Sequence, residues 1–401
     1  MIFKYLARTT DGKVQSGHVE SNGQRSAAAL IKAQNLILIS LDEDKGGFSL
    51  TSLLNGIKGV TSNDVVNFTR QLATMISAGL SLTESLNILK QQITNSQFKI
   101  IIQSIQADVS GGSSFSKSLS MYPDLFDTTY ISLLTAGEAS GNLDDILLRL
   151  ADKLEKSRSF KSKLKGAMIY PVIVIIAMAG VMTVMVVFVI PKLTDMYKSL
   201  NIELPLPTQI LIAISNIVIN YWVFLIIGIT SLVVGFSYFK RTVTGKYTLD
   251  KIALKTPIFS NITKLGIYTE FTRTLSLLMR SGVSIVDALH IVANSLGNVY
   301  FQEEVVNASR KVEKGIPLSE PIISSKYFPP IVGQMISVGE RTGKMDDVLL
   351  KTSAYFESEA DQAVKNLSTA LEPIIMVLLG LMVGVLILSV ITPIYKLTSS
   401  F

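Results

Sequence analysis

Hydrophobic and polar residues follow the same succession in two long stretches of this chain. From residue 62, apolar residues recur at the spacing of helix faces, and a long apolar segment begins near residue 168. The succession returns after residue 245 and ends in another apolar segment near residue 374. The pattern predicts a mostly α-helical membrane protein. We expect two tandem-duplicated antiparallel six-helix bundles in it, each followed by a membrane helix.

Matching residues fix the register of this duplication. Phe68-Thr69-Arg70 recurs 203 positions later as Phe271-Thr272-Arg273. A second motif, named here the Gly-Glu turn, recurs 202 positions later: Gly137-Glu138-x-x-Gly141-x-x-Asp144-Asp145 returns as Gly339-Glu340-x-x-Gly343-x-x-Asp346-Asp347. One residue is therefore missing from the second copy, between the Ser116/Ser319 pair and the Gly-Glu turn.

The remaining segments are assigned around the two copies. Two alternating segments, a helical one and a short β-prone one predict a small α+β module at the amino terminus. A further apolar block is too long for one straight crossing, so we expect it to cross over Tyr221–Phe239 with a helical extension outside. The predicted order is module 1–45, linker 46–61, first bundle 62–167, membrane helix 168–190, external loop 191–209, membrane helix with extension 210–239, second bundle 240–372, membrane helix 373–395 and external tail 396–401.

The charges that flank the apolar segments predict their orientation. Eleven basic residues lie just before the first span and just after the second, against three in the intervening loop and the tail. Because basic residues are retained on the cytoplasmic side, both bundles and the amino terminus should be cytosolic and the carboxyl terminus external. The two copies then point the same way across the membrane, as parallel repeats.

Composition argues against several classes of function. The chain has no cysteine and two histidines, His18 and His290, that are far apart in sequence and lack ligand companions. Its net charge of +6 is explained by the flanks of the spans, which disfavours nucleic acid as a partner. Gly339–Met345 fails as a phosphate-binding loop, because it is one residue short and Met345 replaces the metal-binding hydroxyl. We expect no enzyme activity, cofactor or metal centre.

The Gly-Glu turns are the main candidate site, with three interpretations. In a structural role, the glycines allow a tight turn and the Asp pair lies in the first turn of the next helix, where the macrodipole favours negative charge. In a docking role, the retained polar residues bind a partner. In a metal role, three carboxylates hold a divalent cation, although EF-hand spacing is absent. The residues concerned are Gly137, Glu138, Gly141, Asp144, Asp145, Gly339, Glu340, Gly343, Asp346 and Asp347.

Two arginines interrupt otherwise apolar helical stripes. Arg70 and Arg273 occupy the same position of the two copies. Each either extends its guanidinium to water or pairs with the glutamate of the Gly-Glu turn in its own copy. The second interpretation predicts the ion pairs Arg70–Glu138 and Arg273–Glu340.

The spans contain candidate packing positions but no ionisable residue. Gly380 and Gly384 form a small-xxx-small face that favours close approach to the first span or to another subunit. Pro171 and Pro373 occupy matching positions where two of the spans begin. The absence of Asp, Glu, Lys, Arg and His from the spans disfavours a channel or transporter, the rival class of function.

These motifs together resemble those of the type II secretion system F and type IV pilus platform family. Phe3-x-Tyr5-x-Ala7 with Asp11-Gly12 and Gly17 resembles the opening module of that family. Three motifs of this chain resemble the two repeats of that family: the Phe-Thr-Arg starts, the Gly-Glu turns and the Gly-x-Ser helix breaks at Gly79-Leu80-Ser81 and Gly282-Val283-Ser284. The second copy has Arg341-Thr342 in place of Ala139-Ser140, so its surface need not bind what the first one binds.

The resemblance implies a non-enzymatic assembly platform in the bacterial inner membrane. Its implied partners are a cytosolic hexameric secretion ATPase, pilins or pseudopilins and other inner-membrane assembly proteins. The family also implies self-association, as a dimer or a higher oligomer. The machine would build a pilus, a secretion pseudopilus or a DNA-uptake fibre.

Overall fold

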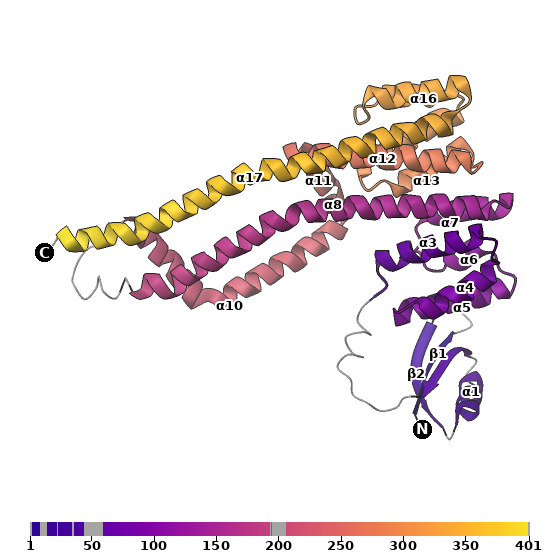
Figure 1. The fold of residues 1–401 in the computed structure, drawn as a ribbon, viewed down its shortest axis with the longest axis horizontal. Coiled ribbons are helices and arrows are strands. Elements are labelled where there is room, and N and C mark those ends of the chain that lie inside the picture. The colour runs from indigo at the N-terminus through magenta and orange to yellow at the C-terminus, as the bar shows by residue number, and fades with distance from the viewer. Residues whose placement is uncertain are drawn as a thin grey trace. The chain divides into compact units, whose positions relative to one another are not determined.

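The computed structural model describes residues 2–8, 14–21, 23–33, 36–43, 59–192, 194 and 206–399 (Figure 1). The chain forms two compact units. The first contains Met1–Arg158 and Leu277–Ile291, and the second contains Ser159–Ser276 and Val292–Phe401. The placement of Leu277–Ile291 in the first unit differs from the uninterrupted second bundle that the sequence predicts. Membership of a unit depends on packing, which order along the chain does not determine.

The amino-terminal segment is a three-stranded antiparallel sheet with one helix. Its elements are β1 (Ile2–Arg8), β2 (Val14–Glu20), α1 (Gln24–Ala33) and β3 (Ile37–Glu43). The strand order is β2-β1-β3. Phe3 and Ala7 of β1 are buried, as are Ala27 and Ile31 of α1, so alternate residues of the strand meet one helix face. This is the order that the sequence predicts, although Asp11-Gly12 and most of the linker lie outside the described residues.

The first copy of the duplication contains six helices. They are α3 (Ser62–Ser77), α4 (Leu82–Gln92), α5 (Ser96–Ser110), α6 (Phe115–Leu119), α7 (Thr128–Ser140) and α8 (Leu143–Val184). Local capping begins several of them, since Thr61 forms a capping box with Asp64, and Ser81 Oγ accepts from the Glu84 N–H at 3.2 Å. The buried Phe68 of α3 packs edge-on against Phe98 of α5, with ring centroids 5.6 Å apart.

The second copy has the same succession with one additional helix. Its elements are α11 (Val243–Lys255), α12 (Pro257–Arg280), α13 (Ile285–Ser295), α14 (Val299–Glu313), α15 (Ser319–Ile323), α16 (Pro330–Thr342) and α17 (Met345–Ser399). Helices α12 to α17 follow the order of α3 to α8. Within the second unit, Tyr268 and Phe271 pack against Phe328, with ring centroids 5.9 and 4.7 Å apart. The helix α17 continues to Ser399, so residues 396–399 of the predicted tail extend a helix.

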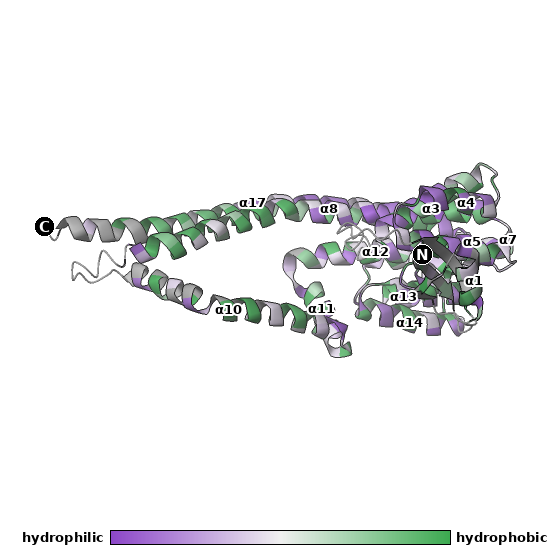
Figure 2. Ribbon diagram, turned by 90° about the horizontal axis from the view of Figure 1, so that it is seen from below, coloured by the Kyte–Doolittle hydropathy of each residue, from purple (hydrophilic) through white to green (hydrophobic). Residues whose placement is uncertain are grey.

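Two described helices are long and apolar enough to cross a membrane. One runs from Leu143 to Lys192, and the other is the apolar part of α17. Figure 2 shows hydrophobic residues concentrated toward the carboxyl end of α8 and in the second half of α17. Neither helix is interrupted where its predicted span begins, and Pro171 lies inside α8.

The third crossing stays a prediction. Helix α10 (Leu206–Arg241) has non-helical backbone angles at Tyr221, the residue where the sequence predicts that the crossing begins. The last part of α10, Ile226–Arg241, and the following helix α11 are bent by 96° relative to each other. They make a third candidate span only if the two helices are counted together as one broken span. The described chain therefore holds two candidate spans, or three with that pair.

A π-helical turn follows α8 directly and contacts α10 within the second unit. The turn covers Met185–Val189, where each backbone carbonyl needs a donor five residues later. For Val186 that donor would be Pro191, which has no N–H. The hydroxyl of the buried Ser215 in α10 donates to the Val186 carbonyl at 2.5 Å instead. Satisfying this carbonyl inside an apolar segment holds the two helices together.

Candidate functional site

The glutamate of each Gly-Glu turn caps a short helix that lies about twenty residues earlier in the sequence. Glu138 accepts from the backbone N–H groups of Phe115 and Ser116 at 2.5 and 3.1 Å, and from the Ser116 hydroxyl. Helix α6 begins there, and the local cap position, Ser114, forms no side-chain hydrogen bond. The carboxylate therefore satisfies backbone donors that the local sequence leaves open.

The second copy repeats this arrangement at the start of α15. Glu340 accepts from the Leu318 N–H and from the Ser319 hydroxyl, both at 2.6 Å. Leu318, at the cap position, has no side chain that could accept a hydrogen bond. The duplication has thus retained a serine and a distant glutamate as one unit, which favours the structural interpretation for these two carboxylates.

The first glycine of each turn permits two helices to approach closely. A Cβ added at Gly137 would lie 3.0 Å from Ile146 Cγ1, and one at Gly339 would lie 2.8 Å from Met345 Cα. The second glycines, Gly141 and Gly343, end the preceding helices with left-handed backbone, at φ of 71° and 68°. A structural role therefore explains the presence of glycine at all four positions.

The aspartate pairs occupy the first turns of the long helices, as predicted. Asp144 and Asp145 open α8, and Asp346 and Asp347 open α17. Asp145 also forms an ion pair with Arg149 one turn later, at 2.6 Å. Among the described residues, no group of three or more His, Cys, Asp or Glu could hold a metal ion. A docking role for these aspartates, of which Asp346 is half-buried and the others are exposed, stays a proposal.

The predicted partners of the two arginines are wrong. Arg70 binds Glu155 through Nε and Nη2, at 2.8 and 2.7 Å, and its Nη2 also contacts Asp152. Arg273 binds Glu357 through Nη2 at 2.7 Å. The glutamates of the Gly-Glu turns point at other helix starts, and the arginines pair instead with the long helices α8 and α17.

Each ion pair ties the opening helix of its copy to the long helix whose later part is a candidate membrane span. In the first copy, Arg158 also donates to the Asn67 side chain at 2.8 Å, so α3 lies antiparallel to α8. In the second, the Ser276 hydroxyl donates to the Asp346 carbonyl at 2.7 Å, so α12 lies antiparallel to α17. These bonds attach the opening helix of each bundle to its long helix.

The Arg70 pair makes stability depend on pH. Its hydrogen bond to Glu155 lowers the pKa of that carboxyl below the ordinary value of 4.5. A carboxyl with a lowered pKa stabilises the fold above the unfolded pKa, and this stability is lost as pH falls through the folded value. Because Glu155 is 36% exposed, the contribution is below about 1 kcal/mol.

We therefore expect Glu155→Gln to flatten the acid limb of the stability curve. The thermal midpoint of the full chain in detergent should fall more steeply below about pH 4.5 in the parent than in this variant. Far-ultraviolet circular dichroism at a series of pH values measures both curves. Curves that stay parallel through the acid range would contradict the assignment.

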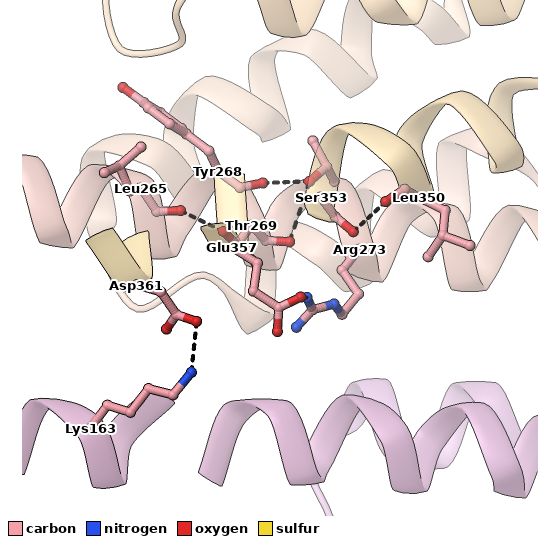
Figure 3. Close-up of polar contacts among 10 residues, drawn as sticks. Lys163, Leu265, Tyr268, Thr269, Arg273, Leu350, Ser353, Glu357 and Asp361 are labelled. Atoms are coloured by element: carbon pink, nitrogen blue, oxygen red, sulfur yellow. Dashed lines mark hydrogen bonds and ion pairs between the residues drawn. The ribbon is translucent and has the colours of Figure 1, made fainter. Parts of the chain in front are cut away.

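Helices α8, α12 and α17 meet just before the predicted spans, within the second unit. Phe160 and Leu164 of α8 pack against Ile262 of α12 and against Val364 and Leu367 of α17. The Lys163 ammonium contacts the Asp361 carboxylate at 2.6 Å, and Figure 3 shows this pair beside the Arg273–Glu357 pair. This cluster, named here the helix junction, is where the two long helices are held together.

The predicted packing glycines of the third span are not in helix contacts. A Cβ added at Gly380 or at Gly384 would meet no atom within 4 Å. Pro171 is buried, whereas Pro373 is exposed. The small-residue face of α17 is therefore uncovered in the described chain, and its packing role stays a prediction.

Comparison with known proteins identifies the repeated unit. A family model described as "Type II secretion system (T2SS), protein F" matches residues 68–191 and 271–393, and one described as "Type II secretion system protein F, N-terminal domain" matches residues 1–42. The type IV pilus assembly protein PilC of Thermus thermophilus is 35% identical over 398 residues, which cover 99% of this chain and 98% of that protein. The type II secretion system protein F of Xanthomonas campestris pv. campestris is 33% identical over 402 residues, which cover 100% of this chain and 99% of that protein. The predicted duplication is confirmed.

Proposed function

Because the chain belongs to the type II secretion system protein F family, we propose that it is an inner-membrane platform protein that couples a cytosolic secretion ATPase to the assembly of pilins or pseudopilins. The names of its relatives divide between type IV pilus assembly and type II secretion, so either machine fits the proposal. In this role the bundles receive the motion of the ATPase, and the membrane helices pass it to pilin subunits.

The continuity of the long helices carries this proposal. From Met345 at the start of α17 to Pro373 at the predicted membrane entry is a distance of roughly 42 Å along one uninterrupted helix. A helix of this length transmits a displacement at one end to the other, provided that it is held by its bundle. The Arg273–Glu357 pair and the helix junction supply that attachment.

The residues of the spans favour a platform over a channel or transporter. A proton relay or a transporter of charged substrates normally has ionisable groups at membrane depth, and the predicted spans contain none. Apolar helices suit contact with the hydrophobic segments of pilins and with other subunits. We include self-association in the proposal, with Gly380 and Gly384 as a face on which a second copy would fit.

Deletion of the gene tests this function. We expect loss of surface fibres in electron micrographs, or loss of secreted substrate, with restoration by the intact gene on a plasmid. The amount of the cytosolic ATPase, followed by immunoblot, is the control. Normal fibres or secretion in the deletion strain, with the ATPase present, would refute the proposal.

A further inference from the structure

The two copies differ in charge at the end of the bundle where the Gly-Glu turn lies. The second copy has five cationic residues at positions where the first has none. Arg310, Lys311, Lys314, Arg341 and Lys344 replace Ala107, Asp108, Gly111, Ala139 and Asn142. Glu313 and Glu320 also replace Ser110 and Lys117, so the second copy is more positive here by three charges. The Gly-Glu turn itself is retained in both copies, so at this end of the bundle the charge difference lies in the residues around the turn.

The five cations belong to one end of the second unit. Arg341 follows Glu340, whose carboxylate holds the Leu318 N–H at 2.6 Å, and Lys314 lies four residues before Leu318. The capping bond therefore fixes the carboxyl end of α16 against the turn that follows α14. All five side chains are exposed. We name these five residues the basic tip.

Exposed apolar residues lead to the basic tip along α16. Ile331 and Val338 are 38% and 45% exposed, and with Gln334 and Arg341 they lie three or four positions apart, on the outward face of α16. The corresponding residues of α7 in the first copy are Thr129, Ser132, Ala136 and Ala139, which are small and uncharged. The second copy thus presents an apolar stripe that ends in cations, and the first does not.

We propose that the basic tip and the outward face of α16 bind an acidic surface of a partner protein. The proposal deepens the proposed function and rests on it for the cytosolic position of the tip. Cations attract carboxylates, and Ile331 and Val338 supply apolar contact for aliphatic side chains among those carboxylates. Phosphates of nucleic acid would leave the two apolar residues without matching contact.

Membrane lipids are not the source of the negative charge. The basic tip lies at the amino end of α17, roughly 42 Å of helix from the predicted entry into the membrane. The potential of anionic headgroups decays within a Debye length, which is about 8 Å at physiological ionic strength. The tip is therefore several Debye lengths from the lipid surface along this helix, which favours a protein over lipid headgroups as the source of the acidic groups.

Exchange of residues between the two copies tests this inference. The variant Arg341→Ala with Lys344→Asn installs first-copy residues in the second turn, where the first copy shows that they are compatible with the fold. The probe is a fluorescein-labelled helical peptide of Glu and Leu, titrated against the full chain in zwitterionic nanodiscs. We expect about ten-fold weaker binding by the variant, and binding to the parent that falls as salt rises.

Two further variants control for non-specific attraction. Lys161→Asn with Lys165→Asn removes the same charge elsewhere on the second unit and should change the dissociation constant by less than about two-fold. Ala139→Arg with Asn142→Lys adds the same two charges to the first copy, which lacks the apolar stripe, and should strengthen peptide binding by less than about two-fold. Equal binding by the parent and the Arg341→Ala, Lys344→Asn variant would overturn the inference.

Competition experiments distinguish the source of the negative charge. The competitors are a single-stranded oligonucleotide, vesicles containing phosphatidylglycerol, and unlabelled peptide. If the oligonucleotide or the vesicles displace the labelled peptide as effectively as the unlabelled peptide does, the inference is also overturned. Fibre assembly is measured separately in cells. Lost fibres on gene deletion together with unaltered peptide binding by the exchange variant would refute the inference while leaving the platform function intact.

Discussion

Glu138→Ala is expected to lower the free energy of unfolding by about 3 kcal/mol, because the carboxylate accepts three hydrogen bonds that begin α6. Its removal leaves the N–H groups of Phe115 and Ser116 at a helix start that has no local side-chain cap. Hydrogen bonds to a charged acceptor are stronger than neutral ones, and unsatisfied donors add a desolvation cost. The thermal midpoint of the full chain in detergent should fall by roughly 5–10 °C.

Matched variants in the same turn separate this structural role from a docking role. Asp145→Ala removes an exposed carboxylate whose ion pair with Arg149 lies within one helix, and should change stability by about 0.5 kcal/mol or less. Glu138→Gln should fall between the two, because one amide oxygen remains as an acceptor. An unchanged midpoint for Glu138→Ala, combined with lost binding of a cytosolic partner, would restore the docking interpretation of Glu138.

Local patterns explain why the helices and their order could be predicted. The repeat fixes the helix count, since six helices follow one another from Thr61 to α8 and the same order returns from α12 to α17. Ser81 and Gly79 act within a few residues of their own positions, as helix cap and helix end. Such short-range chemistry can be read from a single sequence.

The contacts of the charged residues could not be predicted from local patterns. Glu138 reaches a helix start 22 residues earlier, and Arg70 reaches a carboxylate 85 residues later. One signal was present in the sequence, because Glu155 and Glu357 keep the 202-residue spacing of the Gly-Glu turns. A glutamate retained on the long helix, opposite an arginine retained on an antiparallel one, would have indicated the observed pairs.

The path of the third span and the unit to which Leu277–Ile291 belongs could not be predicted, because both depend on contacts between residues far apart in the sequence. The apolar block over 210–239 predicts a crossing that begins at Tyr221 with a helical extension before it, and α10 has its irregular residue at Tyr221. Its path across a membrane depends on packing against other helices. In the same way, the boundary between the two units falls inside α13, after Ile291, and tertiary contacts decide its position.

Replacement of Arg273 by methionine is expected to cost about 2–3 kcal/mol, more than the same change at Arg70. The Arg273 side chain is only 8% exposed and its partner Glu357 is 27% exposed, so the pair is largely removed from water. Deleting the guanidinium leaves a desolvated carboxylate without its strongest counter-charge. Arg70 is 30% exposed and faces carboxylates that water can solvate, so Arg70→Met should cost about 1 kcal/mol or less.

A double-mutant cycle on Arg273 and Glu357 measures the coupling itself. Glu357→Gln in the Arg273→Met background removes the stranded charge, so the double variant should recover more than about half of the loss. Because this pair attaches α12 to the helix that enters the membrane, Arg273→Met should also reduce fibre assembly, and the double variant should not restore it fully. Additive stability losses would refute the coupling. If the Arg273→Met variant is less stable but still assembles fibres normally, the attachment of α12 to α17 is not needed to pass motion to the membrane.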